Sequence, residues 1–145
     1  MVLAGDTVRA SDVTAPGLPD LQTGTATAGP TSGTAELTVL TSSAITLDGF
    51  TSVRVTFEWG NASPSVADDA YLFRIKDNGT TVRESRLQWA GTRIVPGHVE
   101  WISSAAPSAG AHTYTAVVLR VSGTGVLTMA ASATVMYQLS VTAYR

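Results

Sequence analysis

The chain has 145 residues, a mass of 15.0 kDa and a net charge of −2, and only 14% of its residues are charged. This length fits one domain, and the near-neutral charge argues against a nucleic-acid partner, which would select a basic surface. The absence of cysteine excludes disulfides, cysteine-based zinc sites and thiol nucleophiles. No apolar run approaches the ~18 residues of a membrane helix, and no signal peptide is visible, so we expect no membrane partner.

Residues 1–35 are predicted to form an extended N-terminal docking arm. Between Asp12 and Thr34 the chain holds three prolines and several glycines, and it has no sustained period of 2 or 3.6. A flexible tail has the same composition, but such a tail rarely needs apolar residues, which recur along this segment. We expect these residues to anchor the arm on another surface, and they are Val2, Leu3, Val8, Val13, Leu18 and Leu21.

From residue 36 onward the pattern is that of β-strands, so residues 36–145 are predicted to form one β domain. Residues 53–59 alternate strictly between apolar and polar side chains, as does the segment 71–76. Asp77-Asn78-Gly79 then predicts a tight hairpin into a partner strand over 80–88. Further strands are expected over 98–103, 113–121, 126–131 and 135–144.

Turn-forming residues separate these strands at 60–64, 96–97 and 122–125. We count about eight strands, and no segment has a helical period. The sequence therefore predicts an all-β fold, an antiparallel jelly-roll sandwich of about eight strands preceded by the extended arm. Because the chain has one lysine and few other charges to protect its strand edges, we expect it to assemble with copies of itself.

The ionisable residues lack the spacing of an active site or a metal site. A hydrolase could combine a histidine or glutamate with an aspartate or serine, and the candidates are His98, Glu100 and His112 with Asp68, Asp69 or a serine. The Gly-x-Ser-x-Gly motif of such enzymes is absent. Four carboxylates would suit Ca²⁺ but lack the spacing of a calcium loop, and they belong to Asp68, Asp69, Asp77 and Glu84. We therefore expect no enzyme, no bound metal and no cofactor. Gly123-Thr124-Gly125 precedes no helix and is predicted to be a turn, not a phosphate loop.

The tryptophans offer a stacking surface for a sugar. Trp59 and Trp101 fall within predicted strands, where core packing accounts for them. Trp89 comes at the end of a strand and is the best candidate for an exposed ring, with Tyr71 as a second glycan contact. Asn61-Ala62-Ser63 and Asn78-Gly79-Thr80 match glycosylation sequons, and we interpret both as turns.

Three parts of the chain resemble small virion proteins from phages of actinobacteria. They are the opening MVLAGDTVRASDV (1–13), the segments AHTYT (111–115) and LRVSGTG (119–125), and YQLSV (137–141). The resemblance covers the arm and the second half of the domain, while residues 61–95 match only in pattern. It implies a jelly roll similar to tumour-necrosis-factor-like trimers, and a label of capsid decoration protein, head fibre or minor tail protein. The ending TAYR departs from the acidic, glycine-containing tail that is frequent in such proteins.

The resemblance implies a structural protein of a bacteriophage virion. We expect a homotrimeric capsid decoration protein on the virion surface, made in the cytoplasm of the host bacterium. It would dock on the major capsid protein through its arm and stabilise the shell. The alternative is a minor tail or receptor-binding protein, associated with tail proteins, that contacts a host surface glycan through Trp89 and Tyr71. Neither function requires nucleic acid, a membrane or a cofactor.

Overall fold

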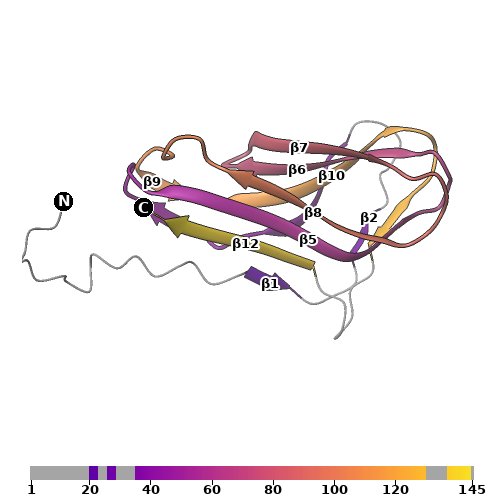
Figure 1. The fold of residues 1–145 in the computed structure, drawn as a ribbon, viewed down its shortest axis with the longest axis horizontal. Coiled ribbons are helices and arrows are strands. Elements are labelled where there is room, and N and C mark those ends of the chain that lie inside the picture. Colours follow the sequence, from indigo (N-terminus) through magenta and orange to yellow (C-terminus); the bar gives the residue numbers. More distant parts are fainter. Residues whose placement is uncertain (1–19, 23–25, 29–34, 130–136, 145) are drawn as a thin grey trace, which may run out of the picture.

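A computed structural model describes residues 20–22, 26–28, 35–129 and 137–144. Among the described residues the secondary structure consists of strands joined by turns and loops, without a helix, as Figure 1 shows. The strands are β1 (Asp20–Gln22), β2 (Ala26–Ala28), β3 (Leu37–Thr41), β4 (Ile45–Leu47), β5 (Ser52–Pro64), β6 (Ala70–Asp77), β7 (Thr80–Gln88), β8 (Val95–Ile102), β9 (Gly110–His112), β10 (Tyr114–Ser122), β11 (Leu127–Met129) and β12 (Tyr137–Tyr144).

Two antiparallel sheets pack face to face. One has the order β3-β10-β6-β7, and the other has β1-β12-β5-β8, with the short strands β11 and β2 placed side by side beyond the end of β12. Each sheet interleaves strands from distant parts of the chain, which is the connectivity of a jelly roll. The predicted antiparallel jelly-roll sandwich is therefore confirmed, and the pair β4-β9 is added at one end.

The strand β5 is the central strand of its sheet. It pairs with β12 on one side and β8 on the other, and its last residues pair with β11. The predicted alternation over 53–59 is confirmed, since Val53, Val55, Phe57 and Trp59 are buried. The predicted turn over 60–64 is wrong, because Ala62–Pro64 pair with β11 and extend the strand. Pro64 is tolerated at the strand end, where a missing N–H breaks no ladder hydrogen bond.

The start of β8 also differs from the prediction. Residues 96–97 were expected to be a turn, but Gly97 lies in the strand opposite Trp59. A side-chain carbon at Gly97 would lie 2.5 Å from the indole ring of Trp59, so only glycine leaves room for that ring. Pro96 is accommodated because β8 is an edge strand.

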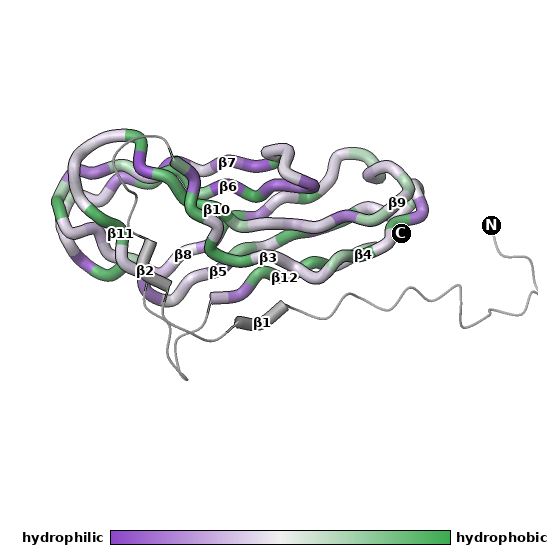
Figure 2. Tube along the Cα trace, turned by 180° about the vertical axis from the view of Figure 1, so that it is seen from behind, coloured by the Kyte–Doolittle hydropathy of each residue, from purple (hydrophilic) through white to green (hydrophobic). Residues whose placement is uncertain are grey.

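The hairpin between β6 and β7 follows the prediction. Asn78 and Gly79 have φ angles of 45° and 86°, which a two-residue turn of the primed type requires at both positions. Figure 2 shows hydrophilic stretches along β7, which is the edge of its sheet. Charged side chains on an edge strand discourage pairing with another chain.

The core is rich in aromatic residues between the two sheets. The rings of Trp59 and Phe73 stack at 4.3 Å and 13°, and Phe73 also faces Phe57 at 6.5 Å and Trp89 at 6.3 Å. Rings of opposite sheets thus interdigitate, which ties the sheets together by dispersion and apolar burial.

Two strands fall within residues 1–35, the range predicted as an arm. Asp20 lies opposite Leu139 and Gln22 opposite Tyr137, so β1 extends the sheet beyond β12. Similarly, β2 pairs with β11. The remaining residues of this range, apart from residue 35, lie outside the described part of the chain.

Candidate functional site

The two residues predicted to contact a glycan are buried. Tyr71 is 0% exposed and Trp89 is 6% exposed, and their rings meet edge to face at 5.8 Å. The expected exposure of Trp89 is therefore wrong. Its backbone carbonyl accepts a hydrogen bond from the N–H of Asp68 at 2.7 Å, which holds the residue against the β5–β6 loop with its ring facing Phe73. A sugar-stacking site needs an exposed ring face, and neither residue offers one.

Two surface depressions border these buried tryptophans. One of about 470 Å³ is lined by Glu58, Trp59, Gly60, Pro96, Gly97 and His98. The other, of about 350 Å³, is lined by Trp89, Ala90, Gly91, Arg93 and Val95. Because both indole rings are almost entirely buried, the depressions do not restore a stacking surface for a sugar.

The four candidate calcium ligands do not form one site: the carboxylates of Asp69, Asp77 and Glu84 each contact different partners, and Asp68 is exposed. In the described part of the chain, no group of three or more His, Cys, Asp or Glu side chains is close enough to hold a metal. Glu84 pairs with Arg74 on the outer face of the β3-β10-β6-β7 sheet, where Glu36 bridges Arg74 and Lys76. Hydrogen bonds from Lys76 and then Arg74 lower the pKa of Glu36. This charged network makes that face a poor apolar docking surface.

Asp69 is a buried carboxylate that holds a distant loop. Its oxygens accept hydrogen bonds from the backbone N–H groups of Thr124 at 3.3 Å and Gly125 at 2.5 Å, and from the Tyr71 hydroxyl at 3.4 Å. Burial and the adjacent Asp69 charge raise the pKa of Tyr71 to about 12. A side-chain carbon at Gly123 would overlap this carboxylate. The turn predicted at 123–125 thus closes around Asp69, a pairing across 55 residues that local pattern cannot reveal.

The candidate hydrolase residues are not assembled into one site. Glu100 pairs with Arg54 across β8 and β5, on the exposed face where His98 also lies. His112 is buried at the end of the sandwich where β4 and β9 pair. Its Nδ1 lies 2.8 Å from the Asp77 carboxylate and its Nε2 lies 2.9 Å from the carbonyl oxygen of Ser108. Both partners are acceptors, so the doubly protonated ring satisfies both contacts.

This arrangement predicts a stability that depends on pH. Burial lowers the pKa of His112, but the hydrogen bonds to Asp77 and Ser108 and the charge of Asp77 outweigh it, so the pKa is raised above 6.5. The stabilisation that the His112 contacts provide is complete below the pKa that this histidine has in the unfolded chain. It is lost as the pH rises through the higher pKa of His112 in the folded protein. We expect His112→Gln to lower the free energy of unfolding by about 1.5–3 kcal/mol below pH 6, and by less at pH 8–9.

Urea unfolding at a series of pH values between 5 and 9 measures this difference. The control is His98→Gln, which alters an exposed histidine on β8 and should leave the pH profile unchanged. A His112→Gln deficit that stays constant across the series would contradict the prediction.

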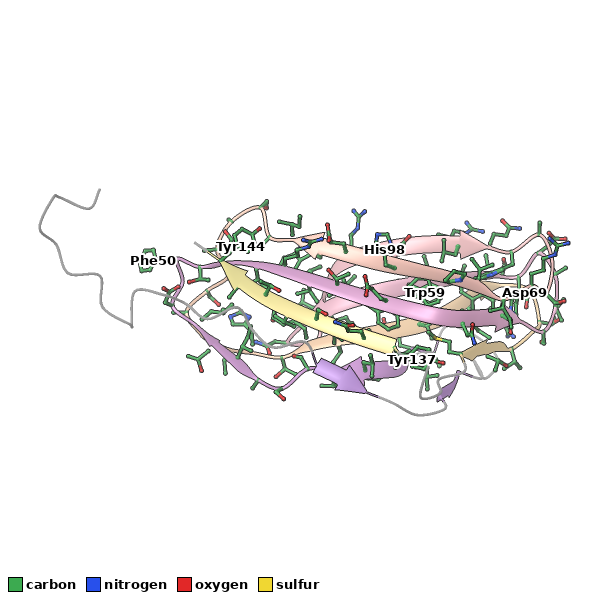
Figure 3. All side chains as sticks on the ribbon, turned by 60° about the horizontal axis from the view of Figure 1, so that its bottom comes forward. Phe50, Trp59, Asp69, His98, Tyr137 and Tyr144 are labelled. Carbon is green, nitrogen blue, oxygen red and sulfur yellow. The ribbon has the colours of Figure 1, made fainter. Side chains whose placement is uncertain are left out.

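Exposed apolar side chains gather at the end of the sandwich where β5 begins. Phe50 is 84% exposed, Ile102 is 52% exposed and Tyr144 is 40% exposed. Tyr144 lies opposite Ser52, and Ile102 lies opposite Arg54, so the two flank the first residues of β5. Figure 3 shows Phe50 and Tyr144 at the same end of the molecule. We call Phe50, Ile102 and Tyr144 the apolar end surface.

Phe50 is presented by an ordered turn. The Asp48 carboxylate accepts hydrogen bonds from the N–H groups of Phe50 and Thr51, both at 2.8 Å, and from the Thr51 hydroxyl at 2.7 Å. Gly49, which lies between Asp48 and Phe50, has a φ of 82°, which a glycine adopts without strain. A large aromatic ring held outward by a closed turn is typical of an interaction surface. The periodicity of the sequence does not identify Phe50 as a functional residue. The signal that could have found it is its place directly after the turn-forming pair Asp48-Gly49.

No protein-family model matches the sequence, and no curated protein matches it. Among the described residues there is also no helix of the length and apolarity needed to cross a membrane. The apolar anchors predicted at Val2, Leu3, Val8, Val13 and Leu18 lie outside the described residues, as does the side chain of Leu21.

Proposed function

We propose that the protein is a structural component of a bacteriophage virion, a capsid decoration protein that docks on the shell through its N-terminal segment. The observation that carries this proposal is the direction of β1. Asp20 lies opposite Leu139 and Gln22 opposite Tyr137, so the N-terminal end of β1 points along β12 toward Tyr144. In this proposal a docking arm that continues in the direction of β1 would reach the side of the molecule that carries the apolar end surface, and the two would form one contact face for a shell.

The sequence resemblance and the jelly-roll fold also support this role. A short arm with scattered apolar anchors binds weakly by itself. A homotrimer would carry three arms, so the second and third contacts form at high effective concentration and the assembly holds far more tightly. An arm that crosses a boundary between shell subunits would clamp them together. In this proposal the major capsid protein is the partner and the virion surface is the location.

A particle-binding assay tests the docking role. Particles that lack this protein are mixed with the purified chain and sedimented. We expect deletion of residues 1–18 to reduce the bound fraction at least tenfold, and Phe50→Ser to reduce it by a smaller factor. The deletion stops before Asp20 because removal of β1 would uncover β12 and disturb the sheet.

The matched control is Arg86→Ser on the exposed edge strand β7, which should bind as the unaltered protein does. Full binding by the truncated chain would reject the docking arm. Immunogold labelling of complete virions locates the protein independently. Label on the heads is expected, and label confined to the tails would replace the decoration role with that of a minor tail protein.

A further inference from the structure

Trp89 carries a buried hydrogen-bond donor without a partner. Its indole Nε1 is shielded from solvent, and no acceptor in the described part of the chain contacts it. Trp59 offers the contrast, because its Nε1 donates to the carbonyl oxygen of Val95 at 3.2 Å. A buried indole N–H in a folded protein normally has an acceptor, so the unpartnered donor of Trp89 requires an explanation.

This donor belongs to a residue that lines a surface depression. The depression of about 350 Å³ lies between the end of β7 and the start of β8, and Trp89 is part of its wall. The hydroxyls of Tyr114 and Tyr137 are also buried without a partner, but neither tyrosine lines this depression or the larger one beside Trp59. A depression of this size with mostly apolar walls and a few polar groups suits a small ligand.

Arg93 supplies a positive charge at this depression. It is an exposed residue of the lining, and none of the ion pairs among the described residues involves it. An unpaired guanidinium can bind a carboxylate through two parallel hydrogen bonds. The other lining residues are Trp89, Ala90, Gly91 and Val95, so the lining side chains contain donors and no acceptor. They therefore favour a ligand that is an acceptor and negatively charged.

Hydrogen bonds hold two walls of the depression but not the loop between them. The carbonyl oxygen of Trp89 accepts from the N–H of Asp68 at 2.7 Å, and that of Val95 accepts from Trp59. The loop and turn hydrogen bonds between backbone groups of the described residues include none at residues 90–93. Because Nε1 of Trp89 is buried, a ligand must displace part of this loop to reach it, and the loop is free to give way.

We propose that this depression binds a small carboxylic acid in its ionised form, with oxygens that accept hydrogen bonds from the Arg93 guanidinium and the Trp89 indole N–H. The apolar part of the acid lies against Ala90 and Val95. The N–H group is at the edge of the indole, so this contact does not need the exposed ring face that a sugar would require. The inference goes beyond the proposed function, since it concerns a ligand of the free protein and holds whether or not the protein binds a virion.

Proton–nitrogen NMR of the indole groups tests the site. The chain has three tryptophans, so each indole N–H gives its own signal. Isobutyrate is the probe, because it joins a carboxylate to a small branched apolar group. We expect the Trp89 signal to shift saturably, with a dissociation constant on the order of millimolar for so small a ligand. The signal of Trp101, which lines neither depression, should stay in place. A Trp89 signal that does not shift would overturn the proposal.

An arginine variant and a neutral analogue test the role of charge. Arg93→Gln should raise the dissociation constant at least fivefold. The matched control is Arg83→Gln, which alters an exposed arginine on β7 outside the depression and should leave binding unchanged. Isobutyramide has the same shape without the charge and should bind at least fivefold more weakly than isobutyrate. Equal affinity for the amide, or for the Arg93→Gln variant, would refute the assigned carboxylate site.

N-Acetylvaline distinguishes a free acid from the C-terminus of a peptide. It presents a carboxylate and a branched side chain beside an amide bond, as a chain end does. Because the depression is small, we expect isobutyrate to bind more tightly than N-acetylvaline. The reverse order would replace the free acid with a peptide C-terminus as the ligand. None of these measurements involves particles, so failure here is distinguishable from failure of the proposed virion role.

Discussion

Replacing Gly123 by alanine is expected to lower the free energy of unfolding by about 3–4 kcal/mol, which is at the upper end for a point mutation. Two effects add. Gly123 has a φ of 88°, and an L side chain there costs about 1–2 kcal/mol of backbone strain. The added carbon would also overlap the buried carboxylate of Asp69, which must then give up the N–H groups of Thr124 and Gly125. Urea unfolding at neutral pH measures the loss.

Gly79→Ala is the matched control for this substitution. Gly79 has nearly the same φ, 86°, but a side-chain carbon there would meet nothing within 4 Å. The Gly79→Ala variant should therefore lose only the free energy of backbone strain, about 1–2 kcal/mol. Equal losses for the two variants would mean that the contact with Asp69 does not constrain the loop.

Phe73→Ala is expected to cost about 3–5 kcal/mol, the range found when a buried aromatic side chain is removed from a core. Phe73 is fully buried on β6, and its ring contacts Trp59 of the opposite sheet and Trp89 at the end of β7. The alanine variant leaves a cavity between the two sheets that the surrounding strands cannot fill. Thermal or urea unfolding measures the change.

The control is the same substitution at an exposed position. Phe50→Ala removes an identical side chain that is 84% exposed, and we expect it to change the free energy of unfolding by less than about 0.5 kcal/mol. This variant also separates stability from interaction, because it should keep the fold and weaken particle binding. A large loss of stability at Phe50 would indicate that its ring is buried in solution.

Most of the long strands were predictable from the sequence, since alternation over 53–59 marks one buried face and the residues at 77–79 mark a hairpin, but the short strands and the strand order were not. The strand ends were harder. Ala62–Pro64 contain turn-forming residues, yet pairing with β11 across more than 60 residues draws them into β5. In the same way, Gly97 was interpreted as a turn residue although its role is to leave room for Trp59. Long-range packing overrides local preference at both places.

The candidate site was less predictable than the fold. Trp89 was expected to be exposed because it follows a strand next to a glycine, but contacts with the β5–β6 loop and with Phe73 bury it. Phe50 was not identified because it stands alone in a turn, without periodic apolar neighbours. Only the three-dimensional arrangement brings Ile102 and Tyr144 to the same end of the molecule. A surface built from three separate segments has no local signature.

The attachment of β1 has a mechanical consequence. Because β1 is antiparallel to β12 and is directed toward Tyr144 at its N-terminal side, tension on the preceding chain along β12 would act along the strand axis. Such a force loads all the hydrogen bonds between β1 and β12 together, in shear, instead of breaking them one after another as in unzipping. A protein held by this segment would therefore resist a pull better than the three paired residues of β1 alone suggest.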